Sequence, residues 1–84
     1  MATWQIALVR EQGVEFAVVC VRDSVIDFPG ERDTLIRWWT RHLGRPAVLI
    51  GAHRHQTYGR RDIVDFLGTI HPSQLPWRQM NVAA

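Results

Sequence analysis

Residues 14–21 read VEFAVVCV, and this run decides which kind of fold the chain can adopt. Valine and phenylalanine are typical of β-strands, and alternate residues of a strand point to opposite faces of the sheet. Residues 4–9 alternate in the same way, and a short loop that contains Gly13 separates the two runs. The pattern predicts a β-hairpin over residues 4–21.

One face of this hairpin is apolar without an obvious cover. A sheet that is covered by helices on one side only should present polar residues on the other side. Here we expect the second face to be apolar, so we predict a symmetric homodimer through it. The alternative is a monomer whose tail, with Leu75 and Trp77, folds across this face. The candidate interface residues are Ala7, Val9, Ala17, Val19, Val21 and Trp77.

The rest of the chain indicates two helices and one more strand. Apolar residues recur at helical spacing over 30–43, and Gly44 and Pro46 then signal the end of the helix. The run AVLIG at 47–51 is typical of a short buried strand, and 59–70 of a second amphipathic helix. We predict an α+β fold in the order β-β-α-β-α, a two-layer sandwich in which a three-stranded, mostly antiparallel sheet carries both helices on one face.

Three points of this fold stay open. The third strand can lie beside the second in parallel, or beside the first with the first in the centre, which is the order we favour. Residues 23–28 can extend the hairpin, form a short edge strand or begin the helix. Residues 71–84 form a tail with two prolines that cannot be a regular helix, and it is expected to pack on the core or on a second subunit.

Composition favours one small domain over residues 1–84. Hydrophobic residues make up 46% of the chain and charged residues 21%, which is ordinary for a globular protein. No apolar run reaches the ~18 residues of a membrane-spanning helix. The N-terminal segment lacks the pattern of a signal peptide, so we expect a cytoplasmic protein without membrane contact. Cys20 is the single cysteine, which excludes an intramolecular disulfide.

Charge is distributed unevenly along the chain. Residues 1–40 hold four arginines and six acidic residues, a net charge of −2, whereas residues 41–84 hold six arginines and two acidic residues, a net charge of +4. Such asymmetry can bring two copies together, or it can draw an anionic partner to the basic half.

The segment GAHRHQTYGRRD, residues 51–62, is the strongest candidate for a binding site. It joins the end of a strand to a helix, where open sheets place their ligands, and it is longer than most such connections. Guanidinium groups can pair with phosphate oxygens, and a tyrosine ring can stack on a base. The candidate residues for binding an anion or a nucleic acid are Arg54, His55, Tyr58, Arg60 and Arg61.

The start of the following helix bears on this hypothesis. If Asp62 caps a helix that begins at Ile63, carboxylates occupy the amides that a phosphate would use. If Thr57 is the cap, the arginines lie in the first turn. The loop can also be a solvated connection, or its arginines can pair with the acidic half of a partner subunit.

Two short histidine motifs suggest a further alternative. His55-Gln56-Thr57 and His71-Pro72-Ser73 fit the pattern His-x-Thr/Ser. In this respect they resemble the paired motifs of two-histidine phosphoesterases, in which one imidazole is the base and the other the acid. The resemblance covers six residues, and it departs from a family whose fold is longer and whose motifs lie on strands.

We therefore predict a small, non-catalytic binding or interaction module that is homodimeric through the second sheet face. The alternative is binding of a nucleic acid or a phosphate ligand through loop 51–62, and the distant alternative is a phosphoester hydrolase that uses His55 and His71. His53 and His55 can share one side of an extended segment, but no cysteine or carboxylate cluster completes a ligand set. No metal site and no cofactor are predicted, and a protein partner is possible.

Overall fold

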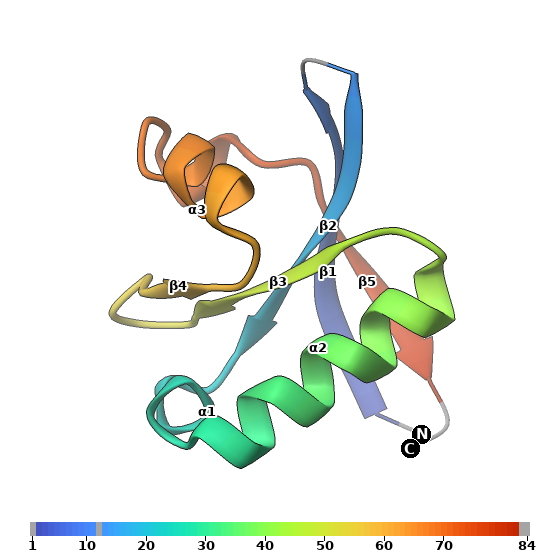
Figure 1. Cartoon of the computed structure of the whole chain (residues 1–84), viewed down its shortest axis with the longest axis vertical. Helices are drawn as coiled ribbons and strands as arrows, with labels where there is room; N and C mark the ends of the chain where they lie inside the picture. Colours follow the sequence, from blue (N-terminus) through green and yellow to red (C-terminus); the bar gives the residue numbers. More distant parts are fainter. Residues whose placement is uncertain (1, 12, 83–84) are drawn as a thin grey trace.

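A five-stranded mixed sheet forms the centre of the protein, in the order β4-β3-β2-β1-β5 (Figure 1). The computed structural model describes residues 2–11 and 13–82. Gln12 of the predicted turn and residues 83–84 of the predicted tail, like Met1, lie outside the described residues. The elements are β1 (Ala2–Glu11), β2 (Val14–Val21), α1 (Asp23–Asp27), α2 (Pro29–Leu43), β3 (Ala47–Gly51), β4 (Thr57–Tyr58), α3 (Arg61–Leu67), the 3-10 helix η1 (Pro72–Gln74) and β5 (Trp77–Val82).

The α+β class, the hairpin and the long helix are confirmed, whereas the sheet is larger than predicted. β3 lies beside β2 in parallel, and the other neighbouring strands are antiparallel. The favoured order, with the third strand beside the first, is therefore wrong. The ambiguous residues 23–28 contain the short helix α1, in which Val25 and Ile26 are buried.

The edge of β1 that was left for the third strand is taken by the C-terminal segment. β5 pairs antiparallel with β1, and Ala2 opposes Val82 at one end of the ladder. Pro72 and Pro76 precede this strand instead of interrupting it, which explains how a segment with two prolines still forms an edge strand. The tail thus packs on the core of its own chain.

Helix α2 covers one face of the sheet through Trp39, which is buried completely. Pro29 occupies the first turn, and Gly44 ends the helix in the left-handed conformation with a φ of 69°, as the stop signal predicted. Trp39 packs on a cluster that includes Ile6, Ala17, Val19, Val21 and Leu49.

Helix α3 covers the opposite face, so the predicted arrangement of both helices on one face is wrong. Ile63 and Leu67 of α3 pack against Phe16, Val18 and Val48 in a second cluster. The protein therefore has three layers, with the sheet between α2 on one side and α3 with η1 on the other. Both apolar faces of the hairpin are buried within one chain.

The residues assigned to the dimer face do not share a face. Ile6 opposes Val19 and Ala7 opposes Val18, so Ala7 and Val9 lie on the face of Phe16 instead of that of Val19. A register that is shifted by one residue reverses every side chain of a strand, and this shift produced the wrong assignment. Four of the six interface candidates are buried inside the chain: Ala7, Ala17, Val19 and Val21.

The homodimer stays a prediction, and it loses its main support because α2 and α3 cover the two faces of the described sheet. Val9 and Trp77, the other two candidates, pack on the cluster beneath α3. Among the helices of residues 2–11 and 13–82, none has both the length and the apolar character that crossing a membrane requires.

Candidate ligand pocket at the ends of the parallel strands

The first part of loop 51–62 is a tight connection between β3 and β4. The backbone N–H of Gly51 donates to the carbonyl of Gln56 at 2.9 Å, and that of His55 donates to the carbonyl of Gly51 at 3.1 Å. His55 adopts a positive φ of 56°, which few non-glycine residues do. The loop is therefore a hairpin, and it holds His55 in a defined turn at the end of β3.

Arg54 of this turn binds the acidic helix α1. Its Nη2 donates to Asp27 Oδ2 at 2.8 Å and to the carbonyl of Asp23 at 3.2 Å. Oδ1 of Asp23 accepts the backbone N–H groups of His53 and Arg54 at 3.2 and 3.3 Å. The hydrogen bond and the charge of Asp27 raise the pKa of Arg54, with a further contribution from Asp23. Arg54 is thus occupied by its own chain.

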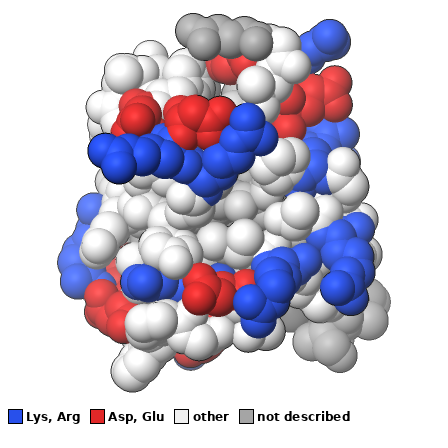
Figure 2. Space-filling model, in the orientation of Figure 1, with Lys and Arg blue, Asp and Glu red and all other residues white. Residues whose placement is uncertain are grey.

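The acidic and basic parts of the sequence also pair within the molecule through Arg45 and Glu15. Arg45 Nη2 lies 3.8 Å from Glu15 Oε2, in addition to the pairs between Arg54 and helix α1. Figure 2 shows arginines and carboxylates side by side on the visible face, in two bands with uncharged residues between them. Two of the six arginines of residues 41–84 therefore pair with acidic residues of residues 1–40 in the same chain.

Asp23 gives a pH dependence that can be measured. Partial burial raises the pKa of its carboxyl. The N–H groups of His53 and Arg54 and the Arg54 charge lower this pKa by more than burial raises it, so the pKa lies below its ordinary value. Such a carboxyl stabilises the fold above its unfolded pKa of about 4, and this contribution is lost as the pH falls through the folded value. We expect Asp23→Asn to lower the melting temperature at pH 7 and to match the wild type near pH 2.

The matched control for this prediction is Asp65→Asn, which changes an exposed carboxylate on α3. Its melting temperature should follow that of the wild type across the whole pH range. A melting temperature of Asp23→Asn equal to that of the wild type at pH 7 would contradict the stabilising role of this carboxylate.

The remaining anion-binding candidates are also not assembled into one site. The guanidinium of Arg32 covers the Tyr58 ring at 3.8 Å from its centroid, and the Tyr58 hydroxyl donates to Asp33 at 3.0 Å. Arg60 pairs with Asp62 at 2.8 Å. Helix α3 begins at Arg61, so neither predicted cap, Asp62 or Thr57, occupies the N-cap position. Arg61 is exposed.

The structure instead brings together the two histidines of the distant alternative. The ring centroids of His55 and His71 lie 6.1 Å apart, at an angle of 77° between the rings. Both line a cavity of about 400 Å³. Its floor comes from three neighbouring strands, and Trp77 and η1 form further parts of its wall. The lining also includes Gln5, Cys20, Ile50 and Ser73.

This location follows from the topology. Cys20 and Ile50 oppose each other near the carboxyl ends of β2 and β3, the single parallel pair of the described sheet. Open sheets with parallel strands bind ligands beyond these ends. Phe66 of α3 packs edge to face on Phe16, near the other end of β2, and the cavity lies over Cys20.

The orientation of His71 is set by its neighbours. Its Nδ1 accepts the backbone N–H of Ser73 at 3.1 Å and lies 2.7 Å from the Ser73 hydroxyl oxygen. In return, the side chain of Gln74 accepts the backbone N–H of His71 at 2.9 Å. A nitrogen that accepts an N–H carries no proton, so the neutral ring of His71 is protonated on Nε2. Nε2–H is then the free hydrogen-bond donor of this ring.

Cys20 is placed for contact but not for nucleophilic attack. Burial raises the pKa of its thiol, and the negative charge of Asp23 raises it further. The thiolate is the nucleophilic form of cysteine, and a raised pKa keeps the group protonated at neutral pH. Within the described part of the chain, no three His, Cys, Asp or Glu side chains are arranged to hold a metal ion.

The sequence had named three residues of this cavity. His55 and His71 were paired as acid and base in the distant alternative, His55 was also an anion-binding candidate, and Trp77 was a candidate interface residue. Gln5, Cys20 and Ser73 were not proposed as site residues at all. The register of β1 against β2 could have indicated Gln5 and Cys20, because both lie near the carboxyl end of β2 on one face.

Comparison of the chain with protein-family models, with curated proteins and with solved structures gives no match.

Proposed function

We propose that the protein is a binding module for a small organic phosphate, which it holds in the cavity between His55 and His71. The observation that carries this proposal is the convergence of the two imidazoles, from segments on either side of α3, on one cavity at the ends of the parallel strands. It refines the predicted phosphate-ligand alternative by moving the site from the arginines to the histidines.

The size and lining of the cavity support this class of ligand. Its volume of about 400 Å³ falls in the usual range for small-molecule sites. Ile50 and Trp77 offer apolar contact for the organic part of the ligand. Nε2–H of His71, the imidazole of His55 and the amide of Gln5 can donate hydrogen bonds to phosphate oxygens.

The same geometry favours binding over cleavage. Thr57 of the first His-x-Thr motif lies in β4 and is not part of the cavity lining. The hydroxyl of Ser73, from the second motif, lies 2.7 Å from His71 Nδ1 and is engaged there. Of the two motifs that resemble those of phosphoesterases, the first therefore contributes its histidine but not its threonine to the cavity. The experiment that tests binding also detects cleavage of a phosphoester.

The test is an NMR titration of isotope-labelled protein with phenyl phosphate, with inorganic phosphate and phenol as partial ligands. We expect saturable shifts at His55, His71 and the indole N–H of Trp77. His55→Ala should weaken binding by about tenfold or more, the usual effect of losing a hydrogen bond to a charged group. His71→Asn should act similarly, while its side chain can still accept the Ser73 N–H.

The matched control is His53→Ala, which removes an exposed imidazole from the same turn but not from the cavity. Its affinity for phenyl phosphate should equal that of the wild type, as should that of Arg60→Ala/Arg61→Ala. Equal binding of phenol and phenyl phosphate, or no saturation by either phosphate probe, would overturn the proposal. Cleavage of the ester in the phosphorus spectrum, lost in both cavity variants, would replace binding by hydrolysis.

A further inference from the structure

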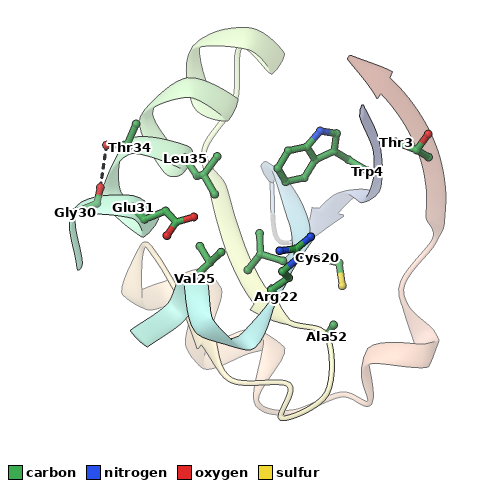
Figure 3. Close-up of a pocket in the computed structure, with 11 residues that line it drawn as sticks. Thr3, Trp4, Cys20, Arg22, Val25, Gly30, Glu31, Thr34, Leu35 and Ala52 are labelled. Atoms are coloured by element: carbon green, nitrogen blue, oxygen red, sulfur yellow. Dashed lines mark hydrogen bonds between the residues drawn. The ribbon is translucent and has the colours of Figure 1, made fainter. Parts of the chain in front are cut away.

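A second and larger cavity lies on the other side of the sheet. It has a volume of about 780 Å³, is open to solvent, and is bordered by α1, α2, the start of β1 and the end of β2 (Figure 3). Cys20 and Ala52 contribute to both cavities, which therefore flank the same end of the sheet. The His55 and His71 rings line the smaller cavity alone, so the larger one has to be explained separately.

The wall of the larger cavity is mostly apolar. Trp4 of β1 and Leu35 of α2 face each other across the space, and Val25 of α1 closes the side between them (Figure 3). Val25 belongs to the buried core cluster around Trp39, and Trp4 and Leu35 pack against that cluster. An apolar group of a ligand would meet an aromatic ring and two aliphatic side chains here.

Two opposite charges border this apolar space. Arg22 lies at the end of β2 and Glu31 projects from the first turn of α2, so that the charges come from different walls (Figure 3). Among the residues that the structure describes, neither forms a salt bridge with another side chain. The hydroxyl of Thr34 donates to the carbonyl of Gly30 at 2.8 Å and is already engaged.

We propose that this cavity binds an apolar zwitterion, which is an amino acid or a short peptide with free termini. Arg22 pairs with the carboxylate of the ligand, because a guanidinium can donate two parallel hydrogen bonds to it. Glu31 pairs with the ammonium group. The apolar side chain of the ligand lies against Trp4, Leu35 and Val25. The proposal does not depend on phosphate binding in the other cavity.

The charge pattern distinguishes this ligand from simpler ones. A fatty acid would satisfy Arg22 and leave Glu31 beside apolar or negative groups, and an organic amine would do the reverse. A ligand that carries both charges next to an apolar group matches all three parts of the lining. A ligand with only one of the two charges that bound as tightly as the zwitterion would therefore contradict the proposal.

The experiment is an NMR titration of the full chain with L-phenylalanine and with alanyl-phenylalanine, which separate an amino acid from a peptide. N-acetylphenylalanine lacks the ammonium group and phenylalaninamide lacks the carboxylate. We expect saturable shifts of the Trp4 indole N–H, assigned through Trp4→Phe, with at least one of the two zwitterions. Each singly charged probe should bind about tenfold more weakly or worse.

The variants assign each charge to its partner. Arg22→Gln should weaken binding of the zwitterion about tenfold and leave phenylalaninamide unaffected, whereas Glu31→Gln should do the same with N-acetylphenylalanine unaffected. Both side chains are exposed, so neither change should unfold the protein. Arg37→Gln, an exposed change on α2 outside the cavity, is the control and should bind as the wild type does. No saturation by either zwitterion, or equal affinity for all four probes, would overturn the proposal.

Discussion

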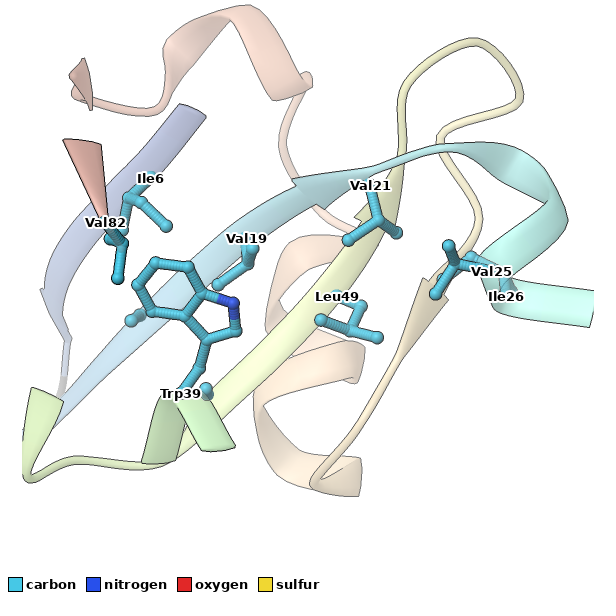
Figure 4. Packing of buried hydrophobic residues seen from close by; sticks show 10 residues of the cluster. Ile6, Val19, Val21, Val25, Ile26, Trp39, Leu49 and Val82 are labelled. Atoms are coloured by element: carbon cyan, nitrogen blue, oxygen red, sulfur yellow. The ribbon is translucent and has the colours of Figure 1, made fainter. Parts of the chain in front are cut away.

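Trp39→Ala is expected to lower the free energy of unfolding by about 3–5 kcal/mol, the usual range for deleting a buried aromatic side chain. Trp39 is completely buried and lies between the sheet and α2, next to Ile6, Val19 and Val82 (Figure 4). Its ring also meets Trp4 edge to face, with 5.4 Å between the centroids. A small domain often has only about 5–15 kcal/mol in total, so the variant should be barely folded at 37 °C.

Urea denaturation followed by circular dichroism measures this loss, and two further variants act as controls. Trp38→Ala changes the neighbouring ring, which is 41% exposed and stacks on His42 with 4.7 Å between the centroids, and it should cost much less. Trp39→Phe should be milder than Trp39→Ala, because it keeps a ring and removes a buried indole N–H that has no hydrogen-bond partner among the described residues. If Trp38→Ala and Trp39→Ala lowered the free energy of unfolding equally, the burial of Trp39 between the sheet and α2 would be contradicted.

Gly59→Ala is the second substitution for which we expect a large effect, a loss of about 2–4 kcal/mol from backbone strain and overpacking together. Gly59 links β4 to α3 with a φ of 152°, which side-chain-bearing residues rarely adopt. A Cβ at this position would lie 2.9 Å from Val48 Cβ and 3.1 Å from Val48 Cα. Val48 is completely buried in β3 and cannot move away without disturbing the sheet.

The comparison for Gly59 is Gly30→Ala in the first turn of α2. A Cβ at Gly30 meets no atom within 4 Å, and the φ of this residue is not positive. Alanine there should leave the stability unchanged or raise it by up to about 1 kcal/mol, because alanine favours helices over glycine. If Gly59→Ala proved as stable as Gly30→Ala, the close approach of Gly59 to Val48 would be wrong.

The local sequence pattern was sufficient to predict those strands and helices whose hydrophobic spacing and end signals lie within their own residues. The alternation in 14–21, the helical spacing in 30–43 and the stop at Gly44 each predicted the element that the structure has. β5 was missed because its identity depends on pairing with β1 at the opposite end of the chain. β4 has two residues, too few for any period to show.

The placement of faces could not be read from single strands. In β2 the alternation separates Phe16 from Val19 correctly, but the face to which Ala7 belongs depends on how the hairpin turn aligns β1 with β2. The pairing of His55 with His71 was predicted only from two short motifs, because their proximity depends on the packing of α3 and η1 and not on their spacing in sequence. The arginines of loop 51–62 predicted an anion-binding site from their number alone. The sequence did not indicate that Arg54 pairs with Asp23 and Asp27 in the folded protein.

The pairing of β1 with β5 also bears on the order in which the protein can be completed during synthesis. β1 precedes β5 in the chain, so it leaves the ribosome well before the strand that pairs with it. Until β5 arrives, β1 has one open edge, and an open edge can pair with another chain. Removing β5 would therefore expose β1 to aggregation.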